Sequence, residues 1–206
     1  MSDGVIVIGA SGHAKVVISS LLAAGITVAG VYDDDQEKWG CEISKCKVFG
    51  PLSMIGDLSG ESALMAVGNN NVRKRLVSCF EKLKWLTVIH PAAYVHPSAI
   101  IGAGTVVFAG AVIQPDTIIG KHCIINSGAT IDHDCIIGDY VHVAPGTNLA
   151  GSVKVGDGAF LGIGSAVIIG VTIGKWSTIG AGGVVINDIP SNAVAVGVPA
   201  GIIKYK

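Results

Sequence analysis

The chain has 206 residues, enough for one large domain or two small ones, and half of its residues are hydrophobic. A formal net charge of −1 gives no general attraction to nucleic acid or to an anionic membrane surface. No uninterrupted apolar stretch of about 18 residues occurs, and the start lacks a signal-peptide pattern, so we expect a cytoplasmic protein without a membrane span.

The five cysteines argue against an extracellular disulfide framework, because their number is odd and their spacing is scattered. Only four residues separate Cys41 from Cys46, but this spacing alone is a weak signal for zinc. We therefore expect free thiols and no metal site.

The first 88 residues alternate strand-like and helical patterns. Strand-like apolar runs occupy residues 4–10, 26–35 and 63–70, and helical spacing occupies residues 11–25 and 72–84. Strands that alternate with helices predict a small parallel sheet with helices packed on it.

The second predicted helix has one apolar face, formed by Val72, Leu76, Phe80 and Leu83. The segment "WLTVI", residues 85–89, then closes this half, and Pro91 and Pro97 mark the entry into a different pattern.

From residue 89 onward an aliphatic residue recurs at every sixth position without interruption. The series comprises Ile89, Val95, Ile101, Val107, Ile113, Ile119, Ile125, Ile131, Ile137, Val143, Leu149, Val155, Leu161, Val167, Ile173, Ile179 and Val185. The residue two positions earlier is mostly small or β-branched, and the following residue is often glycine. This hexapeptide repeat predicts a parallel β-helix with 18 residues per triangular coil and the aliphatic series pointing inward.

Polar and glycine residues follow three of the predicted strands in the N-terminal half. Gly9 and Gly12 lie in the loop "GASGHAKV", Asp33 and Asp34 end the second strand, and Gly68 ends the third. A glycine turn before a helix N-terminus suits a phosphate, and carboxylates at a strand end suit a ribose or a base. The alternative is a structural turn with solvent-facing acids, and the residue types alone do not separate the two.

The segment "TIDHDCIIGD" places His133 between Asp132 and Asp134 inside the apolar repeat. A carboxylate can hold one imidazole nitrogen and raise the basicity of the other, as in acyl-transfer sites. The alternative is a polar corner or a hydrogen bond at a subunit interface. The remaining turn histidines, His90, His96 and His122, are expected to be solvated.

Several motifs in this order resemble one acetyltransferase family. They are "GASGHAK", "YDDD", "AVGNNNVRKRL", the long segment from "INSGATIDHDC" to "GIGSAV", and "VGVPA". Together they resemble the sialic-acid O-acetyltransferase (NeuD-type) family of hexapeptide-repeat enzymes, which includes the bacterial UDP-amino-sugar N-acetyltransferases. The resemblance implies an α/β Rossmann-like domain over residues 1–88, followed by a left-handed parallel β-helix over residues 89–206.

The resemblance also assigns roles to individual residues. It implies a homotrimer with active sites between neighbouring β-helices, with His133 as general base and Asp134 as the acid beside it, for which Asp132 is a possible substitute. The implied acetyl-CoA contacts are His142, Ile163 and Ala181. The implied nucleotide-sugar contacts are Ser11, Gly12, His13, Asp33, Asp34 and Gly68.

The implied reaction is transfer of an acetyl group from acetyl-CoA to the amine of a UDP-linked 4-amino-4,6-dideoxy sugar, without a metal. GDP-linked and dTDP-linked acceptors remain open. O-acetylation of sialic acid or another glycan hydroxyl is the alternative chemistry, because one base serves both reactions. A non-catalytic trimeric β-helix scaffold is the alternative of another class.

Overall fold

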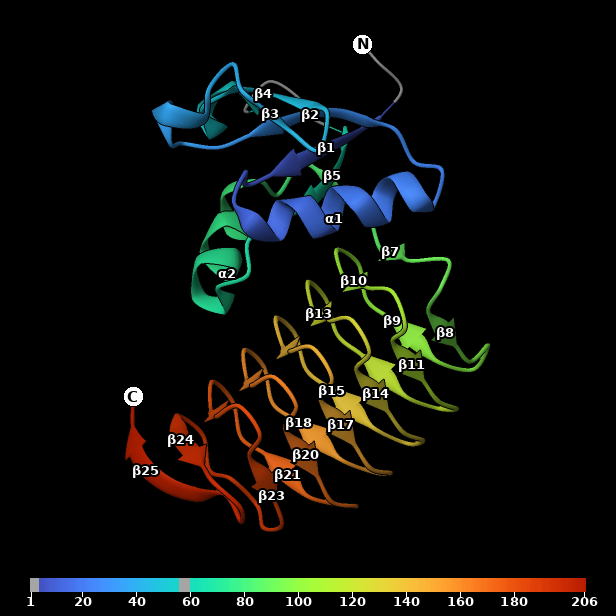
Figure 1. Ribbon diagram of the computed structural model, residues 1–206, viewed down its shortest axis with the longest axis vertical. Helices are drawn as coiled ribbons and strands as arrows, with labels where there is room; N and C mark the ends of the chain where they lie inside the picture. Colours follow the sequence, from blue (N-terminus) through green and yellow to red (C-terminus); the bar gives the residue numbers. More distant parts are fainter. Residues whose placement is uncertain (1–3, 56–59) are drawn as a thin grey trace.

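The computed structural model describes residues 4–55 and 60–206, and it confirms a Rossmann-like sheet followed by a left-handed β-helix (Figure 1). The N-terminal sheet has the order β3-β4-β2-β1-β5-β6 and is parallel except for the β3–β4 hairpin. Its strands are β1 (Val5–Ile8), β2 (Val28–Tyr32), β3 (Glu42–Ile43), β4 (Cys46–Gly50), β5 (Ser62–Met65) and β6 (Lys84–Trp85). Its helices are α1 (Gly12–Ala23), α2 (Asn70–Cys79) and the short 3-10 helices η1 (Gln36–Lys38) and η2 (Leu52–Ile55).

The chain order reverses at β1. From β1 the chain crosses through α1 to β2 on one side, and it later returns to add β5 on the other side. In open parallel sheets such a reversal leaves a crevice at the carboxyl ends of the two central strands. The predicted polar and glycine residues therefore gather at this edge.

The β-helix consists of two-residue strands that pair with equivalents 18 residues away, such as Val106 with Ile124. Three faces result. The first has β7 (Val88–Ile89), β10 (Val106–Val107), β13 (Ile124–Ile125), β16 (His142–Val143), β19 (Phe160–Leu161), β22 (Thr178–Ile179), β24 (Ala193–Val196) and the antiparallel β25 (Gly201–Tyr205). The second has β8 (Tyr94–Val95), β11 (Val112–Ile113), β14 (Thr130–Ile131), β17 (Asn148–Leu149), β20 (Ala166–Val167) and β23 (Val184–Val185). The third has β9 (Ile100–Ile101), β12 (Ile118–Ile119), β15 (Ile136–Ile137), β18 (Lys154–Val155) and β21 (Thr172–Ile173).

The inward aliphatic series forms the core of the β-helix. Every member from Val107 to Val185 is at most 3% exposed. Burying one such side chain contributes roughly 1.5–3 kcal/mol, so the stack supplies most of the stability of this half. The expectation fails at the first member, because Ile89 is 39% exposed. Ile89 belongs to the first coil, which has no further coil stacked above it.

The two halves pack on each other through the first face. In Figure 1, α1 lies between the N-terminal sheet and the first coils. Buried residues of α1 such as Val17 share one apolar cluster with Val88, Val106 and Ile124, which point outward from the first face. The N-terminal domain therefore covers the first coils of this face.

The predicted apolar residues Leu76 of α2 and Phe80 at its C-terminal end pack against the cluster that contains Ile6 and Ile8 of the sheet, but α2 also buries residues that the apolar spacing does not single out. Leu76 and Phe80 are partly buried, but the most buried positions of α2 are Asn70, Arg73 and Val77. Helix α2 ends at Cys79, so Leu83 lies beyond it. The apolar spacing missed Arg73 because its burial depends on the β-helix, not on the sheet.

Arg73 joins the two halves with all five of its N–H groups. It is 1% exposed. Its Nε donates to the carbonyl of His122 at 2.8 Å, and Nη2 donates to the carbonyl of Tyr140 at 2.8 Å and to Oδ1 of Asn70 at 2.9 Å. Its Nη1 donates to the carbonyls of Val67 and Gly68 at 3.0 and 3.1 Å.

We expect Arg73→Lys to reduce the free energy of unfolding by about 2–4 kcal/mol, because a lysine has three donors and leaves buried acceptors unpaired. Urea unfolding followed by circular dichroism measures the change. Arg75→Lys, an exposed position on the same helix, is the matched control. Equal stability of the two variants would contradict the role of Arg73.

Candidate functional site

A crevice of about 230 Å³ lies at the carboxyl ends of the central strands. Ile8 ends β1 and Gly9 follows it, Asp33 and Asp34 follow β2, and Val67 follows β5. Leu52 of η2 and Val72, Arg75 and Leu76 of α2 complete the lining. The structure thus brings together the two predicted acids, and it adds Arg75, which the sequence analysis did not single out. Arg75 could have been predicted from the sequence, because it lies three residues after Val72 and therefore on the same face of the helix.

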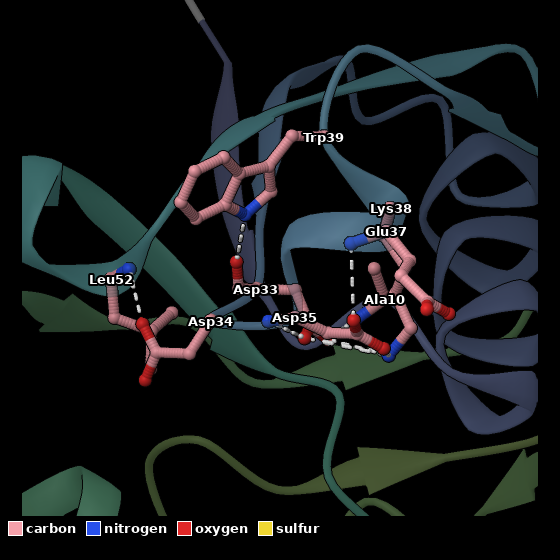
Figure 2. Close-up of polar contacts among 8 residues, drawn as sticks. All are labelled: Ala10, Asp33, Asp34, Asp35, Glu37, Lys38, Trp39 and Leu52. Carbon is pink, nitrogen blue, oxygen red and sulfur yellow. Dashed lines mark hydrogen bonds and ion pairs between the residues drawn. The ribbon is translucent and has the colours of Figure 1, made fainter.

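Asp33 is already engaged by the protein, as Figure 2 shows. Its Oδ2 accepts from the backbone N–H of Ala10 at 2.6 Å, and its Oδ1 accepts from Asp35 N–H at 3.0 Å. Lys38 lies 3.3 Å from Oδ2. These hydrogen bonds and the charge of Lys38 lower the pKa of Asp33 despite its partial burial, which alone would raise it. Asp33 therefore braces the loop after β1 rather than presenting a free carboxylate.

Asp34 has a freer carboxylate than Asp33. Its Oδ1 accepts from the backbone N–H of Leu52 at 2.9 Å, and no hydrogen bond within the described part of the chain uses Oδ2 (Figure 2). A carboxylate oxygen in a crevice suits a ribose hydroxyl or a base N–H. Of the two acids, Asp34 is the one available to a ligand.

The loop after β1 ends at the N-terminus of α1. Ser11 is the N-cap, and its side chain makes no capping hydrogen bond, so N–H groups of the first turn remain available to an anion. Gly12 begins the helix with open space around its Cα. His13 turns inward, and its buried Nε2 has no hydrogen-bond partner within residues 4–55 and 60–206. Burial lowers the pKa of His13 to about 4, with a smaller effect from the charge of Arg73, so the ring is neutral.

Gly68 and His142 meet where the two halves touch. The carbonyl of Gly68 accepts from Nδ1 of His142 at 3.3 Å as well as from Arg73. Because a carbonyl only accepts, Nδ1 carries the proton, and Nε2 accepts from the amide of Asn126 at 3.1 Å. Burial, then the charge of Arg73, lowers the pKa of His142 to about 4. His142 is therefore a neutral, buried ring with a fixed tautomer.

Beside Gly68 a second hollow, of about 220 Å³, opens at the N-terminus of α2. It is lined by Gly68, Asn69, Asn70, Asn71, Gly158, Phe160, Trp176, Thr178 and Lys206. Residues of both halves thus form its wall. Asn70 fixes the hollow by donating to the carbonyls of Gly158 and Ala159 at 3.1 and 3.0 Å.

His122 is buried, so the expectation that it is solvated is wrong. Its ring stacks on Tyr140 at a centroid distance of 5.4 Å and meets Trp85 edge-on. Burial and the charge of Arg73 lower its pKa to about 4. The turn position suggested solvation, but the N-terminal domain covers this turn.

His133 occupies the corner between the second and third faces, in the turn from β14 to β15. Its Nδ1 lies 2.7 Å from Oδ2 of Asp134, and the two side chains are 50% and 59% exposed. Because a carboxylate only accepts, Nδ1 carries the proton, which leaves Nε2 as the free basic nitrogen. The hydrogen bond to Asp134, followed by the charge of Asp132, raises the pKa of His133.

The two flanking acids differ in what they hold. Asp132 accepts from the backbone N–H of His133 at 2.8 Å, so it caps the turn. Asp134 has φ of +59°, a left-handed conformation that aspartate tolerates better than most residues. Asp134, not Asp132, contacts the imidazole ring.

The predicted site residues of the β-helix lie on different corners. His133 is on the corner opposite the covered first face, whereas Ile163 and Ala181 are on the corner between the first and second faces. Ile163 is 57% exposed, and its carbonyl accepts from Gly182 N–H in the next coil, beside Ala181. One chain alone therefore does not bring His133 to the crevice or to the corner of Ile163.

Residues 4–80 match the PglD N-terminal domain family, and residues 98–133 and 116–151 match the bacterial transferase hexapeptide family. Over 98% of its length the chain is similar to perosamine N-acetyltransferase from Caulobacter crescentus, with 42% identity, a TM-score of 0.93 and 97% of that chain covered. The chain belongs to this family of sugar N-acetyltransferases. The family member compared is a histidine-to-asparagine variant in complex with CoA and GDP-perosamine.

Two further members of the family are similar. The acetyltransferase domain of PglB from Neisseria gonorrhoeae FA1090, in complex with acetyl coenzyme A, is 35% identical, with a TM-score of 0.92 and coverage of 98% of this chain and 100% of that one. UDP-N-acetylbacillosamine N-acetyltransferase from Bacillus subtilis (strain 168) is 44% identical over 109 residues, half of each protein. The chain spans at most half the length of the curated relatives it matches.

Within residues 4–55 and 60–206, no helix has the length and apolar character needed to cross a membrane. Nor do three or more His, Cys, Asp or Glu side chains gather there as a ligand set for a metal ion.

Proposed function

We propose that this protein transfers an acetyl group from acetyl-CoA to the amine of a nucleotide-linked amino sugar. The observation that carries the proposal is the likeness of both halves together to an N-acetyltransferase whose structure holds CoA and GDP-perosamine. The crevice at β1, β2 and β5 supports a nucleotide ligand, since Asp34 offers a carboxylate and α1 offers N–H groups to a phosphate. The favoured acceptor is a UDP-linked 4-amino-4,6-dideoxy sugar.

His133 is the proposed general base. Its Nε2 takes a proton from the acceptor amine as the nitrogen attacks the thioester carbonyl. The new C–N bond forms, the C–S bond breaks, and CoA leaves as a thiol that takes up a proton. Asp134 keeps Nδ1 protonated and stabilises the imidazolium that forms.

The acetyl-CoA side of the site is proposed to include His142, Ile163 and Ala181. The exposed Ile163 side chain offers an apolar contact to the pantetheine arm, and the small Ala181 leaves the backbone of its corner accessible. His142 cannot donate from Nε2, because this nitrogen accepts from Asn126. Its contribution is therefore the ring surface and the orientation of Asn126.

The active site is proposed to form between subunits of a homotrimer. His133 and the nucleotide crevice lie on opposite sides of the β-helix, so the crevice of one subunit needs His133 from a neighbour. The third face carries a stripe of exposed isoleucines, Ile100, Ile118 and Ile136, which suits burial against a second copy. Cyclic closure gives each pair of neighbours one site.

A thiol-release assay with acetyl-CoA tests the reaction directly. We expect CoA release with UDP-linked or GDP-linked 4-amino-4,6-dideoxy sugars, and none with the corresponding 4-hydroxy sugars or with sialic acid. Release with sialic acid alone would establish O-acetylation instead. No release with any member of the panel would favour a non-catalytic scaffold.

His133→Ala is expected to lower kcat by about 10²–10⁴-fold and to leave acetyl-CoA affinity nearly unchanged, because proton removal acts in the transition state. The melting temperature should stay close to wild type, since the ring is outside the aliphatic core. A folded His133→Ala enzyme with wild-type kcat would refute the mechanism.

The pH dependence separates the base from its partner. The wild-type rate should fall as the pH drops through the pKa of His133, because the protonated ring cannot accept a proton. Asp134→Asn, which tolerates the left-handed φ, removes the largest cause of the raised pKa and should move this limb to lower pH, with a smaller rate loss than His133→Ala.

Subunit mixing tests the shared site. Asp34→Ala should raise the acceptor KM and leave acetyl-CoA binding intact. At an acceptor concentration below that KM, neither Asp34→Ala nor His133→Ala trimers should turn over, but co-expressed mixed trimers should regain roughly a quarter of wild-type activity by random assortment. Mixtures that gain nothing would place both residues in one subunit's site.

A further inference from the structure

Two opposite charges line the crevice at β1, β2 and β5 without pairing with each other. Asp34 follows β2, and Arg75 lies on α2. Oδ1 of Asp34 accepts from the backbone N–H of Leu52, and no hydrogen bond within the described part of the chain uses Oδ2. The carbonyl of Arg75 accepts from Ser78 and Cys79, but among the described residues its guanidinium forms no hydrogen bond or ion pair. The crevice therefore offers an acceptor and a group of donors to a ligand.

Helix α2 carries three consecutive basic residues, and each of them serves a different surface. Arg73 is buried against the β-helix. The Lys74 ammonium lies 5.2 Å from the ring centroid of Trp176. Arg75 lies on the wall of the crevice, as Val72 does. Of these three cations, only Arg75 reaches a ligand in the crevice.

The rest of the crevice suits the base of a nucleotide better than its phosphates. Its volume of about 230 Å³ is below the range of about 300–1,000 Å³ for complete small-molecule sites, so it holds one part of a ligand. A flat heterocycle fits walls that are apolar apart from a few convergent polar groups. The phosphates have their own donors, the free N–H groups at the N-terminus of α1. The apolar wall residues are Ile8, Leu52, Val67, Val72 and Leu76.

We propose that Arg75 is a specificity-determining residue that donates to an exocyclic carbonyl of the base, while Asp34 accepts from the adjacent ring N–H. This inference deepens the proposed function and rests on its nucleotide-linked acceptor. A carboxylate only accepts hydrogen bonds, and a guanidinium only donates them. The pair therefore selects bases with a carbonyl beside an N–H group, namely uracil, thymine and guanine. Adenine and cytosine carry an amino group beside an unprotonated nitrogen, so their donor would face Arg75 and their acceptor would face Asp34.

Nucleoside diphosphates that differ only at this edge test the proposal by calorimetry. Inosine diphosphate is compared with ADP, and UDP is compared with CDP. We expect the wild-type protein to bind inosine diphosphate and UDP at least about 10-fold more tightly than ADP and CDP, because a mismatched base leaves polar groups unpaired. Equal affinities within both pairs would overturn the inference.

Arg75→Met removes the donors and keeps an apolar side chain of similar length. We expect it to weaken binding of UDP and inosine diphosphate about 10-fold, with little effect on ADP and CDP, so that the base preference decreases. Arg75→Lys keeps a charged donor and should restore part of the affinity. The acceptor KM should rise in Arg75→Met, and the KM for acetyl-CoA should stay within about twofold.

Lys74→Met is the matched control, because it removes the same charge from the neighbouring residue of α2. Lys74 and Arg75 are both exposed, so both variants should keep the wild-type melting temperature. We expect Lys74→Met to bind all four nucleotides with wild-type affinity. An equal loss in Lys74→Met and Arg75→Met would show that Arg75 acts only through net charge, and the inference would be wrong.

A phosphate contact is the alternative role for Arg75, and a shortened ligand series separates the two. A contact with the base predicts the same fold loss in Arg75→Met for UDP, UMP and uridine, with uridine binding followed by NMR titration. A contact with the phosphates predicts a loss that disappears with uridine and that is as large for ADP and CDP as for UDP. That second pattern would overturn the inference.

Because these measurements need no turnover, they also separate this inference from the proposed function. If the base preference depends on Arg75 but no acceptor releases thiol from acetyl-CoA, the base contact is correct and the proposed reaction is wrong. If a UDP-linked sugar is acetylated and Arg75→Met keeps the wild-type acceptor KM and base preference, the reaction is correct and the role of Arg75 is wrong. If the wild-type protein binds no nucleoside diphosphate, both fail.

Discussion

The packing of the N-terminal domain on the β-helix depends on the hydrogen bonds of the buried Arg73 guanidinium. This group donates to carbonyls in the loop after β5 and in two successive coils of the β-helix, so it fixes the position of α2 along the β-helix axis and its orientation around that axis. Among the described residues no carboxylate forms an ion pair with it, and burial lowers its pKa only to about 10, so it remains a cation at neutral pH. Its charge helps to keep His122, His142 and His13 neutral.

This arrangement divides the chemistry between rigid and accessible regions. The neutral histidines lie at the interface of the two halves, where they pack and accept or donate fixed hydrogen bonds. The basic histidine, His133, lies on the far corner, where water reaches it and carboxylates raise its pKa. Histidines in this one molecule thus have pKa values shifted in opposite directions. Burial beside a cation lowers the pKa of an imidazole, and exposure beside an anion raises it.

The sequence predicts those parts of the structure that depend on local repetition. The six-residue aliphatic period defines the coils, because each inward side chain packs on the equivalent side chain of the next coil, 18 residues along the chain. The burial of Arg73 and His122 could not be predicted, since it arises from contact between domains that no local spacing encodes. Likewise, the position of Asp33 and Asp34 at a strand end predicts that they share a crevice. Only the fold shows that the backbone N–H of Ala10, 23 residues before Asp33, donates a hydrogen bond to the Asp33 carboxylate.

The unbroken 18-residue coil also limits how the chain can change in length between the domain interface and His133. Adding or deleting one hexapeptide there would move His133 to another of the three corners, a third of a turn around the axis of the β-helix, although the inward aliphatic pattern would be kept. Only the insertion or deletion of a whole 18-residue coil would keep His133 at the same corner, and this change would move the imidazole by about 4.8 Å along the axis. Length variation in this segment is therefore restricted by the angular position of one side chain rather than by the stability of the β-helix.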